Sequence, residues 1–220
     1  MKRIILTIAI ISVGATALFA QSPGFKKGAR FSLGEASFKD FNHDNITTDS
    51  KLLMSGGVSV SNQFTENFGL MADVLFTSKG AKGSGTTNVG AFGSEEKFDD
   101  TYRLFYAELP IMAKISVGAD NFYIKGFAGP SINFNLLGTE TRVFENGNVD
   151  NNEGYRDRQL NDLEVIEFST VIGGGIDVVN SVGQTFFVDL RLSSPISSLG
   201  KIQGATPSNS YFSIGVGYLY

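Results

Sequence analysis

The fold of this chain is decided by its last residues, Ser210–Tyr220, which read SYFSIGVGYLY. Large apolar side chains occupy every second position, including Phe212 and Tyr218, and Ser213 and Gly215 lie between them. Such alternation predicts a β-strand with one apolar face and one face of small or polar residues. The run is long enough to cross a bilayer, because a tilted transmembrane strand needs about 9–11 residues.

The same alternation recurs about eight times along the chain, and no segment after residue 20 shows helical periodicity. The alternating runs are Lys27–Gly34, Leu52–Asn62, Phe68–Ser78, Tyr102–Ser116, Phe122–Leu136, Val165–Val179, Thr185–Ser194 and Ser210–Tyr220. Most are longer than the strands of soluble proteins, which usually have about 5–6 residues. The length of these runs therefore favours membrane strands over a soluble β-sandwich.

The connections between these runs alternate in length. Residues 63–67, 117–121 and 180–184 are short, whereas the other connections are long, polar and rich in Gly, Asn or Asp. The long ones are residues 35–50, 79–101, 138–163 and 195–209. Transmembrane barrels have short periplasmic turns and longer extracellular loops. We therefore predict an all-β fold, an eight-stranded antiparallel up-and-down transmembrane β-barrel with both chain termini on the periplasmic side.

Most charged residues of the strands share the phase opposite the apolar one. An Arg or Lys on the lipid face at mid-bilayer would cost about 2–4 kcal/mol, so the charged phase should face the interior. An eight-stranded barrel is only wide enough for side chains to fill it. We expect an interlocked ionic core rather than a wide pore. The predicted lumen-facing residues are Arg30, Asp73, Glu108, Lys114, Lys125, Glu167, Asp177, Asp189 and Arg191.

Residues 1–20 have the layout of a signal peptide. Lys2 and Arg3 precede a short apolar stretch, and polar Gln21 follows Ala20. The stretch is short for a membrane-spanning helix, which needs about 20 residues. We expect cleavage after Ala20 and a single barrel domain over residues 21–220 of the exported protein.

The ending of the chain also resembles a targeting signal. Ser213, Gly215, Tyr218 and Tyr220 form a pattern like the terminal strand that the outer-membrane assembly machinery reads. We expect Tyr220 to pair with the strand that contains Phe31, which would close the barrel. It would then lie at the periplasmic interface, where aromatic residues gather.

Composition excludes several classes of function. The chain has no Cys and one His, so disulfides, cysteine nucleophiles and His-rich metal sites are ruled out. The net charge is −4 and no basic patch forms, which makes nucleic acid an unsuitable partner. We predict no cofactor, no bound metal and no catalytic residue.

Five segments of the chain resemble PorT-like outer-membrane β-barrel proteins. They are GARFS at 28–32, YAELPIMAK at 106–114, YIKGFAGPS at 123–131, GGGIDV at 173–178 and the ending at 212–220. The resemblance covers essentially the whole of the mature chain and implies the fold and the location. The founding member of that family is linked to protein secretion, a role that does not transfer on fold alone.

Four further features leave alternatives open. Pro110 and Pro130 lie inside predicted strands, where they mark either a bulge that shapes the lumen or a local irregularity. The glycines at 173–175 lack the Lys-Ser/Thr of a phosphate loop and indicate a bend or a close strand contact. His43 among loop acids is interpreted as part of a solvated loop rather than a catalytic cluster, because nothing in its spacing places it beside a nucleophile. The acidic loop at 146–162 lacks EF-hand spacing and is interpreted as solvated rather than calcium-binding.

These observations favour a non-enzymatic barrel with a structural or interaction role, in which the extracellular loops carry recognition. The expected partners are outer-membrane lipids, the barrel-assembly machinery and an extracellular or secretion-system protein. The first alternative is a narrow, porin-like channel for small solutes lined by the inward charges. The others are an accessory role in secretion and a lipid-active enzyme that uses His43.

Overall fold

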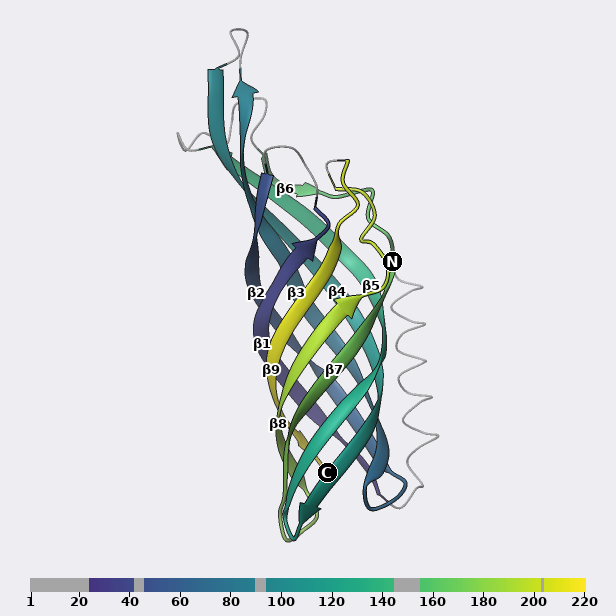
Figure 1. Ribbon diagram of the computed structural model, residues 1–220. Coiled ribbons are helices and arrows are strands. Elements are labelled where there is room, and N and C mark those ends of the chain that lie inside the picture. Colours follow the sequence, from purple (N-terminus) through teal and green to yellow (C-terminus); the bar gives the residue numbers. More distant parts are fainter. Residues whose placement is uncertain (1–23, 42–45, 90–93, 145–154, 203) are drawn as a thin grey trace.

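The computed structural model describes residues 24–41, 46–89, 94–144, 155–202 and 204–220, and its strands form a closed ring (Figure 1). The strands are β1 (Phe25–Lys39), β2 (Ile46–Gln63), β3 (Phe68–Val89), β4 (Ser94–Ala119), β5 (Phe122–Phe144), β6 (Tyr155–Gln159), β7 (Ile166–Val179), β8 (Thr185–Pro195) and β9 (Ser208–Leu219). Neighbours in the ring are antiparallel in the order β4-β3-β2-β1-β9-β8-β7-β5, and pairing of β4 with β5 closes it. The predicted eight-stranded antiparallel barrel is confirmed, and β6 pairs with β5 outside the ring.

The first and last strands close the barrel as the sequence predicts. Phe31 lies opposite Val216, and the ladder continues to the end of the chain. The amide of Tyr220 donates to the carbonyl of Lys27 at 2.8 Å, and the amide of Lys27 donates back at 3.0 Å. No free edge therefore remains between β1 and β9. A bilayer requires this closure, because lipid cannot form hydrogen bonds with open backbone groups.

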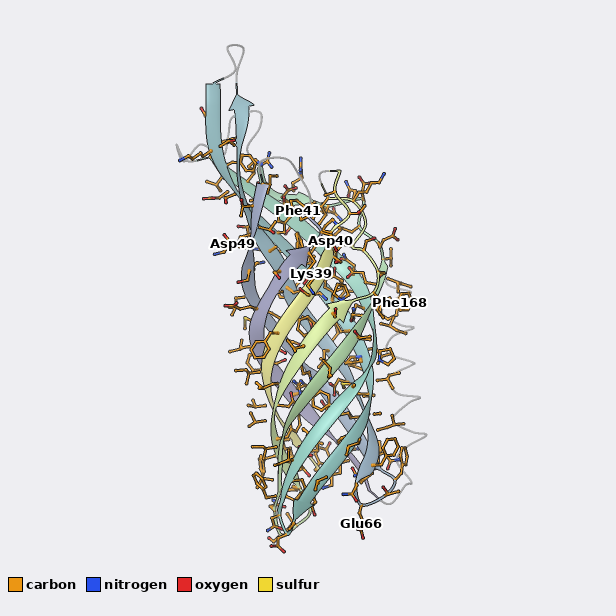
Figure 2. The ribbon with its side chains drawn as sticks, viewed as in Figure 1. Lys39, Asp40, Phe41, Asp49, Glu66 and Phe168 are labelled. Atoms are coloured by element: carbon orange, nitrogen blue, oxygen red, sulfur yellow. The ribbon has the colours of Figure 1, made fainter. Side chains whose placement is uncertain are left out.

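The outer surface of the ring carries a belt of exposed apolar side chains, including Phe168 in Figure 2. Along each strand these side chains alternate with buried polar ones, as in the burial pattern of β8. The belt ends at Phe76 on β3 and at Phe105 on β4. Figure 2 shows Glu66, in a short turn, at the opposite end of the barrel from Asp40 and Phe41. We call these the turn end and the loop end.

The strands extend further at the loop end than the sequence indicates. Residues 79–101, predicted as a loop, lie mainly in β3 and β4, whose ladder continues to Val89 opposite Ser94. β6 lies within 138–163, which was also predicted as a loop. The prediction followed apolar alternation, which stops at the lipid boundary. Backbone hydrogen bonds continue beyond it because strand pairing requires no apolar face.

Pro110 interrupts the pairing of β3 with β4 locally, and Pro130 that of β4 with β5, but the register is the same on either side of each proline. Pro110 lies opposite Ser131, and the β3–β4 ladder keeps the same register on either side of Pro110. Pro130 lies opposite Thr170 in an unbroken β5–β7 register. The register shift between β4 and β5 occurs at Phe105/Tyr106 instead. The interpretation of Pro110 and Pro130 as bulges is therefore wrong, and each is a local irregularity.

The proposed signal peptide at 1–20 lies outside the described residues, as does His43. Within the described part of the chain, no helix is long and apolar enough to cross a membrane.

Candidate functional site

All nine side chains predicted to face the lumen are buried, none more than 8% exposed, and they come from six strands of the ring. They are Arg30 on β1, Asp73 on β3, Glu108 and Lys114 on β4, Lys125 on β5, Glu167 and Asp177 on β7, and Asp189 and Arg191 on β8. Burial of so many charges is tolerable only where each finds opposite charges or hydrogen-bond partners.

A chain of ion pairs crosses the middle of the barrel. Arg30 donates two hydrogen bonds of 2.6 Å to the carboxylate of Asp189. Arg191 lies 3.5 Å from the same carboxylate and donates to Asp73 at 2.5 Å. Strands β1, β8 and β3 are thereby tied together through the interior.

A second group lies toward the turn end. Lys125 pairs with Asp177 at 2.6 Å and lies 3.8 Å from Asp189. Lys114 lies 3.9 Å from Asp177, and Lys26 donates to the hydroxyl of Thr185 at 2.8 Å. This group joins β4, β5, β7 and β8 to the start of β1.

A third group lies toward the loop end and is centred on Glu108. Its carboxylate accepts hydrogen bonds from Lys79 at 2.8 Å, Thr77 at 3.1 Å and Tyr211 at 3.3 Å. The hydroxyl of Tyr106 donates to Glu167 in the same region. Thus each carboxylate among the nine faces a cation or a hydroxyl donor.

Three more side chains belong to this network and are not among the residues predicted to face the lumen: Lys79, Tyr106 and Tyr211. Lys79 was assigned to a loop, although the alternation that places Asp73 inside also places residue 79 inside. Its ammonium group lies 4.1 Å from the ring centre of Tyr106 and 5.5 Å from that of Tyr211, close enough for cation–π contact. Counting alternate positions past Ser78 would have found Lys79.

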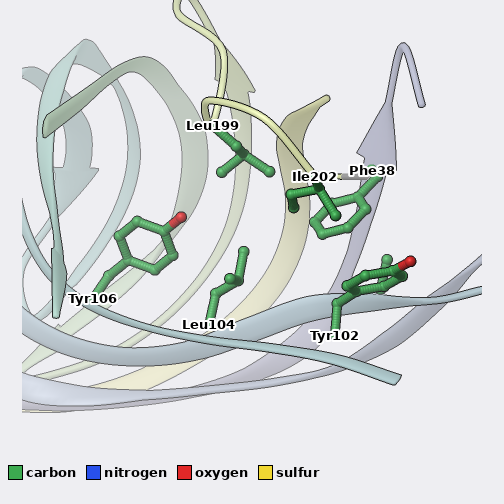
Figure 3. Close-up of a cluster of buried hydrophobic side chains, with 7 residues drawn as sticks. Phe38, Tyr102, Leu104, Tyr106, Leu199 and Ile202 are labelled. Atoms are coloured by element: carbon green, nitrogen blue, oxygen red, sulfur yellow. The ribbon is translucent and has the colours of Figure 1, made fainter. Parts of the chain in front are cut away.

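An apolar cap fills the barrel at the loop end (Figure 3). Leu199 and Ile202, from the segment between β8 and β9, are at most 1% exposed. They pack with side chains from β1, β3 and β4, and a few half-buried residues surround the cluster. The buried members are Phe38, Ala81, Tyr102, Leu104, Tyr106, Leu199 and Ile202, and the partly buried ones are Phe41, Leu160 and Leu163.

Beyond the cap, β2 to β6 form a sheet that we call the outer sheet. Arg142 makes two hydrogen bonds of 2.7 Å to Asp100, and its guanidinium lies 3.9 Å from the ring centre of Phe98. Arg158 on β6 donates to the buried carboxylate of Glu140 at 2.7 Å. A groove of about 450 Å³ lies on this sheet, lined by Thr47, Ser84, Gly85, Thr86, Lys97, Phe98 and Asp99.

Several buried polar atoms in the lumen have no hydrogen-bond partner within the chain. They include Asp73 Oδ1, Ser59 Oγ, and Nε and Nη2 of Arg191. Ser59 pairs with Asp73 across β2 and β3, so these atoms share one region. Because buried polar groups are almost always hydrogen-bonded, this is the region of the lumen where a bridging water would complete the network.

Two alternatives for chemistry gain no support among the described residues. No group of three side chains from His, Asp and Glu is placed to hold a metal ion in that part of the chain. His43 and the acidic residues at 146–154 lie outside it. Asp40, the described neighbour of His43, adopts a left-handed backbone conformation with φ of 59° and is exposed in the loop.

A model of one protein family, described as outer membrane protein beta-barrel domain, matches residues 19–200. No curated protein matches the sequence significantly. Among solved structures, neisserial surface protein A (NspA) is 13% identical, with a TM-score of 0.46, over 89% of this chain and 96% of its own. OprG of Pseudomonas aeruginosa is 11% identical with a TM-score of 0.44, over 89% and 95%. Ail, the attachment invasion locus protein of Yersinia pestis, is 8% identical with a TM-score of 0.42, over 90% and 100%.

Proposed function

The chain belongs to the outer membrane protein beta-barrel domain family, and we propose that it is a non-enzymatic barrel whose outer sheet binds a protein partner outside the cell. Membership of the family places the barrel in the outer membrane. The turn end then faces the periplasm and the loop end faces the outside, as is general for such barrels.

The reach of the outer sheet is the observation that carries the proposal. The apolar belt ends at Phe76 on β3, but the strand continues to Val89. At about 3.3 Å per residue this leaves roughly 40 Å of strand beyond the belt. Figure 1 shows β3 and β4 projecting beyond the other strands. A barrel with a purely structural role has no evident need for so long a projection.

The outer sheet is also ordered in a way that suits binding. The paired contacts of Arg142 with Asp100 and Phe98 fix β5 against β4, and Arg158 fixes β6 against β5. A preorganised surface loses less conformational entropy on binding than a flexible loop does. The groove offers hydroxyls and two exposed side chains of opposite charge, Lys97 and Asp99. Such groups supply the polar contacts that form the rim of a protein interface.

The described interior favours this function over a channel. Leu199 and Ile202 fill the outer mouth, and ion pairs fill the middle, so a solute would have to displace both. The secretion role rests on the PorT-like resemblance alone. We therefore propose that the ion pairs in the lumen keep the barrel rigid and that the outer sheet binds the partner.

Site-specific photo-cross-linking on intact cells tests the proposal. A cross-linking residue at Thr86, in the groove, should form one discrete protein adduct. The same residue at Val188, which is 51% exposed in the apolar belt, should give lipid adducts and no such band. Deleting residues 82–101 and joining β3 to β4 by a short turn should abolish partner binding while the barrel still assembles. An adduct at Thr86 that matches the Val188 pattern would overturn the proposal.

A further inference from the structure

The half of the lumen nearer the periplasm holds more cations than carboxylates. Among the described residues, the central ion-pair chain and the group toward the turn end together contain five cations and three carboxylates. The cations are Lys26, Arg30, Lys114, Lys125 and Arg191, and the carboxylates are Asp73, Asp177 and Asp189. Charges that are enclosed by a low-dielectric wall require compensation, so this excess calls for additional negative charge.

The excess is concentrated on the lysines nearest the periplasm. Arg30 and Arg191 are matched by Asp189 and Asp73 at 2.6 and 2.5 Å. Lys26, Lys114 and Lys125 instead share Asp177, and only Lys125 contacts it closely, at 2.6 Å. Lys114 remains 3.9 Å from that carboxylate, beyond hydrogen-bond distance, and is only 8% exposed. Its ammonium group therefore lacks a direct acceptor on Asp177.

A neutral donor accompanies Lys114 on the same interior face. Ser116 lies two residues nearer the turn end and is 5% exposed. Its Oγ has no hydrogen-bond partner within the chain. A buried hydroxyl without a partner, two residues along the strand from a buried ammonium group that lies 3.9 Å from Asp177, is an arrangement that suits an acceptor-rich ligand.

We propose that Lys26, Lys114 and Ser116 bind a small oxyanion, such as inorganic phosphate, inside the periplasmic mouth of the barrel. The ammonium groups supply charge-assisted donors, and the hydroxyl supplies a third donor for another oxygen. Asp177 keeps Lys125 occupied, which leaves the other two lysines for the ligand. The apolar cap closes the opposite end, so the anion enters and leaves from the periplasm. This site is separate from the outer sheet and does not depend on the function proposed for it.

Titration calorimetry of the purified, detergent-solubilised barrel with inorganic phosphate tests the site at constant ionic strength. The wild type should show saturable binding of one phosphate per barrel, and chloride at the same ionic strength should give no comparable heat. Lys114→Gln should weaken binding by about tenfold or more, since it removes a charged donor. Ser116→Ala should weaken it less, because the hydroxyl is neutral.

Lys82→Gln is the matched control, because Lys82 is exposed on β3 outside the apolar belt and should leave binding unchanged. The heat-dependent shift in gel mobility shows whether each variant has assembled. Where Lys114→Gln does not assemble, the wild-type titration decides alone. Absence of saturable heat, or unchanged affinity in an assembled Lys114→Gln variant, overturns the site. Binding only of an acidic periplasmic peptide, and not of phosphate, also overturns it.

Discussion

Arg30 on β1 reaches Asp189 on β8 by passing over Gly215, the residue of β9 that lies opposite Asp189. A Cβ atom at Gly215 would lie 2.0 Å from Arg30 Nη2 and 2.6 Å from its Cζ, so a larger residue there would force the guanidinium to shift. The last strand therefore contributes space as well as hydrogen bonds. Gly215 was predicted as part of the assembly signal, and this contact gives it a second role in the folded barrel.

Gly215→Ala should destabilise the barrel by about 1–3 kcal/mol, the usual cost of overpacking, because the guanidinium group must move off Asp189. Urea unfolding in lipid vesicles measures the free energy. Gly126→Ala is the control, since a Cβ there meets nothing within 4 Å. Equal stability of the two variants would show that the Arg30 guanidinium can pair with Asp189 without passing over residue 215.

Breaking the same ion pair from one side should cost more than removing it entirely. Asp189→Asn leaves Arg30 and Lys125 near an uncharged amide, and an unpaired buried charge typically costs about 3–5 kcal/mol. The double variant Arg30→Met/Asp189→Asn removes a cation as well and should recover part of that loss. A double-mutant cycle of unfolding free energies measures the coupling. Strictly additive losses would mean that the two side chains do not stabilise each other.

The barrel and its ionic interior could be predicted from the sequence because both follow from the two-residue alternation of side chains along each strand. Alternation places Arg30 and Arg191 on the inner phase, and lipid excludes them from the other phase. The cap could not be predicted, because Leu199 and Ile202 belong to an irregular segment with no periodicity. Nor could the partners of Asp189, since Arg30 is 159 residues away in sequence. Their meeting depends on the register of β9, which alternation alone does not fix.

Weakening the cap should expose the segment between β8 and β9 to protease. Leu199→Ala removes a fully buried side chain, a change that costs about 2–5 kcal/mol in well-packed cores. Local opening of the segment should then become frequent, and trypsin added to intact cells should cleave faster after the exposed Lys201. Ile196→Ala, at a position 66% exposed in the same segment, should change nothing. Identical cleavage rates in both variants would contradict the packing role of Leu199.

The filled interior predicts a barrel that conducts no steady ionic current. Planar bilayers containing the purified wild type should remain silent, because the cap and the ion pairs occupy the described part of the lumen. Glu108→Gln and Arg191→Met should also remain silent if they assemble. A steady current in the wild type that either substitution alters would instead support the narrow channel.

The rigidity of the outer sheet can be tested at Arg142. Arg142→Ala removes both hydrogen bonds to Asp100 and the contact with the ring of Phe98. The carboxylate of Asp100, 1% exposed, would lose these two donors, and loss of a buried group's partner costs about 1–3 kcal/mol. Amide hydrogen exchange of the outer parts of β4 and β5 should accelerate, while exchange in the apolar belt should stay slow. Lys97→Ala is the control, because Lys97 is exposed on the same strand as Asp100, and it should preserve slow exchange. If Arg142→Ala left exchange in the outer sheet unchanged, backbone pairing alone would account for its order, and the preorganised binding surface would lose its ionic basis.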